Sequence, residues 1–214
     1  MALDLVAVLY RTWNEALAVS PVQATFLIWD AWILSWIIAT VWSRPAAARP
    51  AFVDQAIHWT PTVLGFLLLS YGSLIQVHGS FHWLTDTRLW SLPNAAAWVL
   101  TGVCAAALLF TWWARIWLGS LWSGSVNRKE AHVVVQSGPY RWVRHPIYTG
   151  LIAAAFAMAI QIGMLNNLLG AALMAFGFWL KARLEERFLS AELGSEEYAT
   201  FRRRTPMLVP FWPR

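Results

Sequence analysis

The polar segment SGPYRWVRHPIYTG, residues 137–150, stands directly before an apolar run, and its side chains are suited to binding a charged ligand. His145 and Tyr148 are three residues apart, while Lys181 and Glu185, at the end of a later apolar run, are four apart. In helices, these spacings place each pair on one helix face. A helix amino terminus with a histidine suits a carboxylate, and a partly buried glutamate suits an ammonium or a ribose diol. These four residues are therefore candidates for binding a ligand that carries both charges.

The same residues also fit a structural interpretation, in which basic side chains anchor helix ends among lipid headgroups. On that interpretation Glu185 and Glu186 only pair with basic neighbours, which are Arg141, Arg144, Lys181, Arg183 and Arg187. S-adenosylmethionine carries a carboxylate, an ammonium and a ribose diol, so it is the ligand that the binding interpretation favours. Composition alone does not separate the two interpretations.

The composition is that of an integral membrane protein. The 214 residues are 58% hydrophobic and only 13% charged, and 16 of them are tryptophan, which is an apolar and aromatic excess over ordinary soluble domains. A spanning helix needs roughly 20 mainly apolar residues, and the sequence predicts five such spans: 22–42, 60–77, 94–114, 147–163 and 166–184. The predicted fold is all-α, with spans one to three in residues 1–114 and spans four and five with a cytoplasmic tail in residues 115–214.

Spans four and five are predicted to form a helical hairpin. Pro146 suits the first turn of a helix, Gly163 ends span four, and the short MLNN turn sends span five back antiparallel. Because the two runs have similar lengths, the end of span five returns to the level of His145 and Tyr148. Small residues would let the two backbones approach closely; they are Gly150, Ala154, Ala157, Gly170 and Gly177.

Charge predicts the orientation. With five spans, 14 of the 16 basic residues lie on one side of the membrane, and only Arg11 and Arg88 remain on the other. The positive-inside rule then predicts a cytoplasmic carboxyl terminus and an external amino terminus. The net charge of +5 fits a basic face beside anionic lipid, so we expect membrane lipids and no nucleic acid as partners.

A few single residues constrain the membrane region further. Cys104 is the only cysteine, which excludes an intrachain disulfide and a cysteine metal cluster. Asp30 lies inside the first span, where a charge costs roughly 2.5–3.5 kcal/mol at the bilayer centre, so we expect it to face other helices. His78 and His82 could chelate a metal only within a helix, and we predict no metal site.

Three segments of the second half resemble the integral membrane isoprenylcysteine carboxyl methyltransferase family, to which phospholipid methyltransferases are more distantly related. They are ARIWLGSLWSG, HVVVQSGPYRWVRHPIYTG and KARLEERFLSAELGSEEYATFRRRTPMLVP, and together they span about half of the chain. The G-P-Y, the R-H-P-x-Y-x-G, the paired glutamates and the final R-T-P-x-L-x-P occur in the family's order and spacing. The resemblance implies that residues 115–214 are a methyltransferase catalytic region that uses S-adenosylmethionine.

The resemblance also implies roles for individual residues. The cofactor site would contain His132, Val133, Val134, Val135, Tyr140, His145, Pro146, Ile147, Tyr148, Glu185 and Glu186. The candidate catalytic residues are Lys181, Tyr148 and Arg144. Lys181 stands where the prenylcysteine enzymes have a substrate-binding arginine, and a lysine lacks the two-pronged grip of a guanidinium on a carboxylate.

The favoured reaction is carboxyl O-methylation of a prenylcysteine-like or other lipophilic acceptor, which enters from the bilayer while the cofactor arrives from the cytosol. A carboxylate is already ionised at neutral pH, so this reaction requires no general base. The alternative among enzymes is N-methylation of an amino phospholipid, which needs a route for proton loss. The alternative from another class is a non-enzymatic membrane scaffold or a small transporter, although a transporter would carry polar residues near mid-membrane in several spans. The oligomeric state is not predicted.

Overall fold

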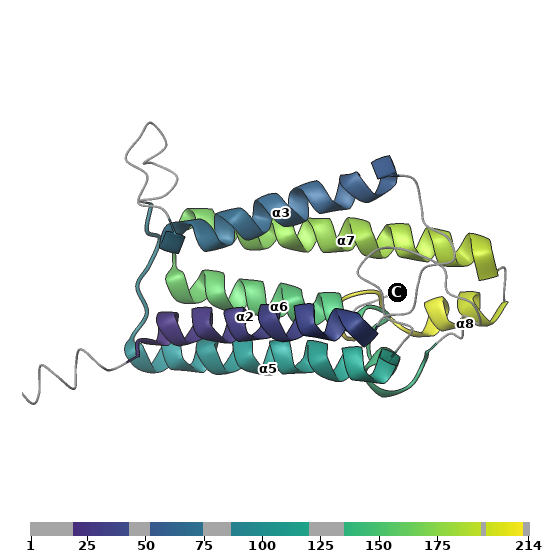
Figure 1. Cartoon of the computed structure of the whole chain (residues 1–214), viewed down its shortest axis with the longest axis horizontal. Helices are drawn as coiled ribbons and strands as arrows, with labels where there is room; N and C mark the ends of the chain where they lie inside the picture. The colour runs from purple at the N-terminus through teal and green to yellow at the C-terminus, as the bar shows by residue number, and fades with distance from the viewer. Residues whose placement is uncertain (1–18, 43–51, 75–86, 120–134, 194–195, 212–214) are drawn as a thin grey trace, which may run out of the picture.

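A computed structural model of the protein describes residues 19–42, 52–74, 87–119, 135–193 and 196–211, which form an all-helical bundle. In chain order its elements are α2 (Pro21–Ile38), the 3-10 turn η1 (Ala39–Trp42), α3 (Phe52–Leu74), α5 (Asn94–Leu118), the 3-10 turn η3 (Gly138–Arg141), α6 (Pro146–Ile162), α7 (Leu165–Leu193) and α8 (Glu196–Arg204). Five long helices lie side by side, with α8 at one end of the bundle (Figure 1). The all-α prediction is confirmed.

Each of the five predicted spans coincides with a helix, although residues 75–77 of the second span lie outside the described residues. By length and composition, Pro21–Val41 and Asn94–Leu118 can cross a membrane, and Pro146–Ile162 is a shorter apolar helix. Helix α7 continues to Leu193, beyond the predicted end at 184, because its charged residues are good helix formers that hydropathy alone does not register. The number of spans stays a prediction.

The exposed surface of α2 fits a membrane environment. This helix buries Thr25 and Trp29, while its exposed side chains include Leu27, Leu34 and Ile38, each of which exposes more than half of its surface. A helix that is apolar on its exposed faces is stable where the surrounding medium is itself apolar. The membrane character that the composition predicts is therefore supported by the fold.

Helix α6 has the predicted bounds. His145 is its N-cap and Pro146 its first residue, and Gly163 ends it with a left-handed φ of 73°. A side chain at Gly163 would also collide with the Trp90 carbonyl, so glycine satisfies both the backbone conformation and the close approach. Only Met164 then separates this cap from Leu165, where α7 begins.

Glycines form two close helix contacts, and neither of them joins α6 to α7. A Cβ atom at Gly65 of α3 would lie 2.5 Å from the Met174 backbone nitrogen of α7, and one at Gly170 would lie 2.5 Å from the Leu69 nitrogen. Likewise, a Cβ atom at Gly150 of α6 would lie 2.7 Å from a backbone oxygen of α5. The prediction that Gly150 and Gly170 bring spans four and five together is therefore wrong: Gly150 approaches α5, and Gly170 approaches α3.

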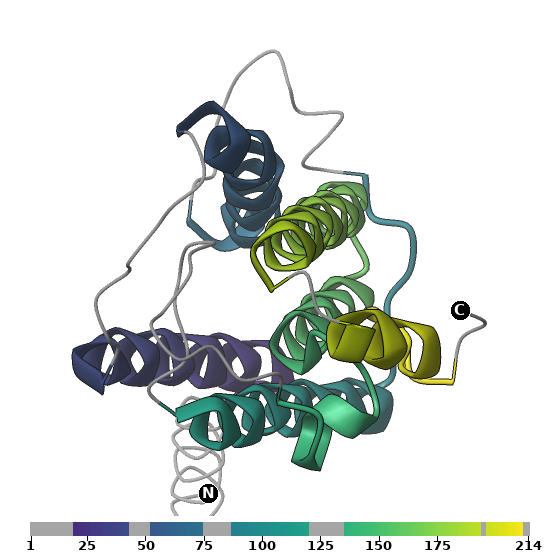
Figure 2. The same cartoon turned by 90° about the vertical axis from the view of Figure 1, so that its right-hand side faces the viewer.

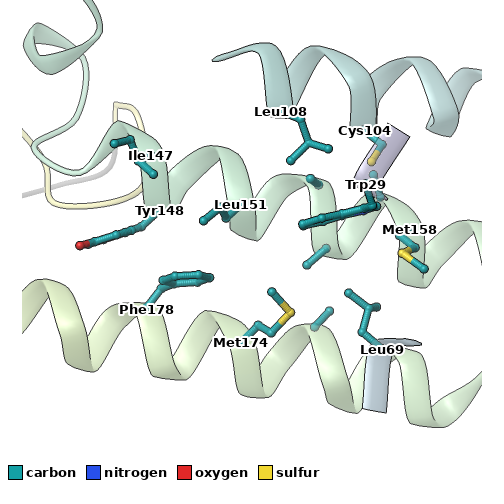
Figure 3. Packing of buried hydrophobic residues seen from close by; sticks show 14 of the residues in the cluster. Trp29, Leu69, Cys104, Leu108, Ile147, Tyr148, Leu151, Met158, Met174 and Phe178 are labelled. Atoms are coloured by element: carbon teal, nitrogen blue, oxygen red, sulfur yellow. The ribbon is translucent and has the colours of Figure 1, made fainter. Parts of the chain in front are cut away.

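These pairs meet at a common apolar core. Figure 2 shows the helices end-on, with α3 beside α7 and α6 beside α5. Figure 3 shows the core between them, where Leu151 and Met158 of α6 approach Met174 of α7, with Trp29 and Cys104 from the α2–α5 side. The core thus fixes the positions from which the ends of α6 and α7 project.

The expectation that Asp30 faces other helices is wrong, because its side chain is exposed. Helix α2 turns a different stripe toward α5: Thr25 Oγ1 lies 3.1 Å from Thr101 Oγ1, and Trp32 Nε1 donates to Thr111 Oγ1 at 2.8 Å. Since hydrogen-bonding side chains already occupy that stripe, Asp30 is left on the outer surface of the helix.

Candidate active site

The residues before α6 form the tight turn η3, which rests on the end of α5. Gly138 has a φ of 59°, and a Cβ atom there would lie 2.5 Å from the Trp117 ring. Trp117 Nε1 donates a hydrogen bond to Ser137 Oγ at 3.1 Å. The turn buries Tyr140, whose hydroxyl donates to the Ala114 carbonyl at 3.5 Å. The G-P-Y sequence thus fixes the path of the chain into α6.

Glu185 of α7 faces the first turn of α6. The Tyr148 hydroxyl donates to Glu185 Oε1 at 2.6 Å, and His145 Nδ1 lies 3.3 Å from Glu185 Oε2. The Glu185 side chain nevertheless keeps 20% of its surface exposed. Because each carboxylate oxygen accepts more than one hydrogen bond, Glu185 can still accept hydrogen bonds from a ligand.

Glu186 is enclosed by cationic side chains. Its Oε1 lies 2.6 Å from Arg144 Nε and 3.3 Å from His145 Nε2, and its Oε2 lies 3.3 Å from Arg202 Nε. Only 4% of its side chain is exposed. With three basic partners and almost no accessible surface, Glu186 holds protein side chains in place, whereas the neighbouring Glu185 is accessible.

The two carboxylates favour a charged His145. Burial lowers the pKa of His145, but hydrogen bonds to Glu185 and Glu186 outweigh it and raise the pKa above the usual value. Burial likewise opposes ionisation of Glu186, but hydrogen bonds from His145 and Arg144 lower its pKa to about 2. Both ring nitrogens of an imidazolium are donors, so His145 can donate to both glutamates at once.

The carboxyl-terminal segment of residues 205–208 crosses the start of α6. The Arg144 backbone nitrogen donates to the Pro206 carbonyl at 2.9 Å, and the His145 backbone nitrogen donates to the Met207 carbonyl at 3.1 Å. The N–H groups of Arg144 and His145, directly before the first turn of α6, are therefore bound to backbone carbonyls of this segment.

The Arg144 guanidinium joins the same segment to the site. Its Nη1 donates to the Arg202 carbonyl at 2.9 Å and to the Thr205 carbonyl, while its Nε contacts Glu186. Arg144 was predicted to be catalytic, and the structure places it in a network that links α6, α7 and the segment after α8. Its contacts hold these three parts of the chain together, and its catalytic role stays a prediction.

Lys181 lies on α7, one turn before the glutamate pair, and is buried against aromatic rings. Its Nζ is 5.1 Å from the centroid of the Tyr148 ring and 5.5 Å from that of the Trp59 ring. The Tyr148 ring stacks on His145 at 5.4 Å and on Phe178 at 5.3 Å. Figure 3 shows Tyr148 beside Phe178, with its hydroxyl directed away from the apolar core. The core therefore ends in an aromatic layer that carries a cation.

Most of the predicted site residues lie together. The structure brings together Tyr148, Lys181, Glu185, Glu186, Arg144 and His145, with Pro146 and Ile147 buried in the first turn of α6. Tyr140 is a buried residue of η3, and both Tyr140 and Val135 pack in the apolar core. His132, Val133 and Val134 lie outside the described residues.

Sequence reasoning missed two contributors. The segment 205–208 belongs to the R-T-P-x-L-x-P motif, which carried the family resemblance but suggested no contact with His145. Trp59 comes from α3, a helix in which no motif was recognised, so nothing in the sequence connected it to Lys181. Among the described residues, no group of three His, Cys, Asp or Glu side chains could hold a metal ion.

Comparison with known proteins finds a family match over this part of the chain. Residues 97–191 match the isoprenylcysteine carboxyl methyltransferase family, a range that includes every site residue from Tyr140 to Glu186. The human protein-S-isoprenylcysteine O-methyltransferase is 30% identical over 87 residues, which are 40% of this chain and 30% of that protein.

Two bacterial relatives carry a different name. A methanethiol S-methyltransferase of Mycobacterium tuberculosis is 44% identical over 85 residues, which are 39% of this chain and 31% of that protein. Methanethiol S-methyltransferase 2 of Bradyrhizobium diazoefficiens is 31% identical over 176 residues, or 76% of this chain and 66% of that protein. The chain spans about a third of the length of the human and mycobacterial relatives.

Proposed function

Because the chain belongs to the isoprenylcysteine carboxyl methyltransferase family, we propose that it is a membrane methyltransferase that uses S-adenosylmethionine. The favoured reaction is carboxyl O-methylation of a prenylcysteine-like or other lipophilic acceptor. The observation that carries the proposal is the accessible Glu185 of α7, held by Tyr148 and His145 of α6. The family's paired glutamates and its R-H-P-x-Y segment thereby meet in one site.

The side chains of Glu185 and Tyr148 suit the charged groups of S-adenosylmethionine. Glu185 combines a carboxylate with 20% exposure, which suits an ammonium or a ribose diol, and the Tyr148 ring offers a face that suits a sulfonium. S-adenosylmethionine would supply an electrophilic methyl group, whose transfer requires no metal and no covalent enzyme intermediate. Tyr140, His145, Pro146 and Ile147 would shape the same site, as would His132, Val133, Val134 and Val135.

Glu186 and Arg144 support this site in our proposal by holding His145 and the carboxyl-terminal segment. A charged His145 between two carboxylates orients Glu185, and Glu186 fixes the second ring nitrogen of that histidine. Groups held by such contacts keep their geometry without rearrangement when a ligand arrives. Both residues act through His145, so they are positioning residues.

Lys181 is proposed to hold the anionic group of the acceptor. Its ammonium lies in the aromatic layer between Trp59 and Tyr148, where water is largely excluded and attraction to an anion is stronger than in bulk solvent. A carboxylate needs no deprotonation at neutral pH. The amine of a phospholipid such as phosphatidylethanolamine is protonated at neutral pH and must lose that proton before methyl transfer, which disfavours the alternative of phospholipid N-methylation.

S-methylation of a thiol is a second candidate, because the relative that aligns with 76% of this chain is a methanethiol S-methyltransferase. A thiolate is an anion, like a carboxylate, so Lys181 would suit either acceptor. The two reactions differ in the size of the acceptor and in the need to deprotonate a thiol.

We also propose five spans, with the carboxyl terminus and the active site on the cytoplasmic side and the amino terminus outside. The helices at all five predicted spans support this arrangement, as does the distribution of basic residues. The cofactor would then arrive from the cytosol and a lipophilic acceptor from the bilayer.

The test is methyl transfer by the purified full-length protein in detergent, with S-adenosylmethionine that carries a deuterated methyl group. Three acceptors are supplied separately: an N-acetylated, S-prenylated cysteine, methanethiol and phosphatidylethanolamine. Mass spectrometry should find a labelled methyl ester of the prenylated cysteine. A labelled thioether alone would favour the second candidate, and a product from the amine lipid alone, or no product at all, would overturn the proposal.

A further inference from the structure

We infer that Trp59 of α3 selects acceptors by the length of their apolar chain, because its exposed ring lies beside the Lys181 ammonium. The inference rests on the proposed function and names the residue against which the acceptor lies. It also gives the first half of the chain a part in the site, which the family match over residues 97–191 leaves out.

Close packing of α3 on α7 fixes the position of Trp59. A Cβ atom at Gly65 would lie 2.5 Å from the Met174 nitrogen, and the backbone of His58 approaches Gly177 so closely that a side chain there would lie 3.1 Å from its carbonyl. Helix α3 therefore has little freedom to slide along α7. Trp59 follows His58 directly, so its ring is set against the end of α7 that carries Lys181.

Trp59 offers exposed surface beside the Lys181 ammonium. Nζ of Lys181 lies 5.5 Å from the centroid of the indole ring. The lysine is only 7% exposed, whereas Trp59 is 44% exposed. An acceptor that brings an anion to Nζ from the α3 side therefore contacts the indole before it reaches the charge.

The outer face of α3 continues from Trp59 as an apolar stripe. Val63 and Phe66 follow at four and seven residues and are 47% and 37% exposed; this spacing places the three side chains on one helix face. A chain that lies along the stripe brings its anionic end to Lys181 when it reaches Trp59. The stripe and the cation together match a molecule with one anionic head and one long apolar tail.

The complementarity predicts selection by chain length. A long chain gains contact with the indole, and a loss of aromatic contact of that kind corresponds to about a tenfold loss of affinity. An acceptor with the same carboxylate but without a long apolar chain makes little contact with the indole ring. Trp59 is thus a specificity-determining residue that leaves the cofactor side of the site unchanged.

The experiment compares two acceptors with the same carboxylate, the S-farnesyl and S-methyl derivatives of N-acetylcysteine, in mixed micelles with the full-length protein. Trp59→Leu should raise KM for the farnesyl acceptor about tenfold, with little change in kcat and no change in KM for the methyl acceptor. Trp59→Phe keeps an aromatic ring and should fall between parent and Trp59→Leu. Trp98→Leu removes a tryptophan of α5 with the same 44% exposure and should behave like the parent.

The outcomes distinguish this inference from the function on which it rests. If the parent methylates neither acceptor, the proposed function is wrong and the inference is overturned with it. If the parent is active and Trp59→Leu keeps the parent's ratio of the two KM values, only the role of Trp59 is wrong. Calorimetric binding of S-adenosylmethionine should be equal in parent and Trp59→Leu, and a loss of that binding would mean that the residue is structural.

Discussion

The two ends of the α6–α7 pair are built from different chemistry. At the end where α6 turns into α7, neutral side chains bond to backbone carbonyls: Asn167 Nδ2 donates to the Leu69 carbonyl at 2.6 Å, and Trp90 Nε1 donates to the Ile160 carbonyl at 2.8 Å. We call this the turn end. At the opposite end, the mouth end, ionised side chains surround His145. The turn end also has Arg88, whose Nη1 donates to the Ile162 carbonyl at 3.3 Å, but the ion pairs among the described residues lie at the mouth end.

The contrast indicates why ion pairs gather at the mouth end. Removing charged groups from water is costly, and an apolar or neutral replacement often stabilises a protein equally well. Clusters of perturbed titratable groups are typical of functional sites. The proposed ligand would account for the charges at the mouth end, whereas the turn end needs only to hold its helices.

The largest effect should come from labelling the two ends from one side of the membrane. Ser91, next to Trp90 at the turn end, and Glu196, at the start of α8 near the mouth end, are both exposed. In a Cys104→Ala background, Ser91→Cys should react with an impermeant thiol reagent in intact cells, and Glu196→Cys should react only after the cells are opened. Labelling of Glu196→Cys from outside would reverse the proposed orientation.

The second-largest effect is expected from the removal of the Glu186 carboxylate, which should lower the stability of the protein. Glu186→Ala leaves the buried Arg144 and His145 without this shared carboxylate, and breaking a buried ion pair costs about 3–5 kcal/mol. Thermal unfolding in detergent should show the loss. Arg203→Ala, which removes an exposed charge of α8, is the control and should change stability by less than about 0.5 kcal/mol. Equal stability of Glu186→Ala and the parent would contradict the network.

A smaller loss is expected at the turn end. Asn167→Ala leaves the Leu69 carbonyl without its donor, which should cost about 1–3 kcal/mol of stability. Affinity for S-adenosylmethionine should stay at the parent value, because the mouth end is untouched. Asn94→Ala, at an exposed position of α5, is the matched control. A loss of cofactor affinity in Asn167→Ala would show that the two ends are not independent.

The smallest effect is a pH dependence confined to the mouth end. The pKa of His145, which faces Glu185, Glu186 and Arg144, is raised, so its contribution to stability is present below the ordinary histidine pKa of about 6.5 and is lost as pH rises above it. The pKa of Glu186 is lowered to about 2, so its contribution is present above the ordinary value and is lost as pH falls toward 2. Thermal stability should decline above about pH 6.5, and His145→Gln should remove that decline. The same slope in His145→Gln would assign it to another group.

The sequence alone predicts several features of both the turn end and the mouth end. Pro146 and Gly163 fix the two bounds of α6 through local backbone preferences, so the sequence alone predicts both bounds. The sequence places His145, Tyr148, Lys181 and Glu185 together because a short turn joins two apolar runs of similar length. Local rules were sufficient for these features.

The wrong predictions concern residues whose type indicates a close contact but does not specify which helix makes it. Gly170 predicts a close helix approach, but a glycine does not specify which helix approaches, and α3 lies there. Asp30 was assigned to an interior face, although the polar side chains that α2 turns toward α5 are Thr25 and Trp32. Contacts between distant segments, such as Met207 with His145, depend on tertiary packing, which spacing along the chain does not encode.

The measurement that tests the account most directly is calorimetric binding of S-adenosylmethionine to the full-length protein and to Glu185→Ala. Glu185 is the accessible carboxylate of the mouth end, and the loss of a charge-assisted contact should weaken binding by about tenfold to a hundredfold. Glu196→Ala, which removes an exposed glutamate of α8, should bind like the parent, and thermal unfolding verifies that each variant is folded. If folded Glu185→Ala binds the cofactor as tightly as the parent, the mouth of α6 and α7 is not the cofactor site.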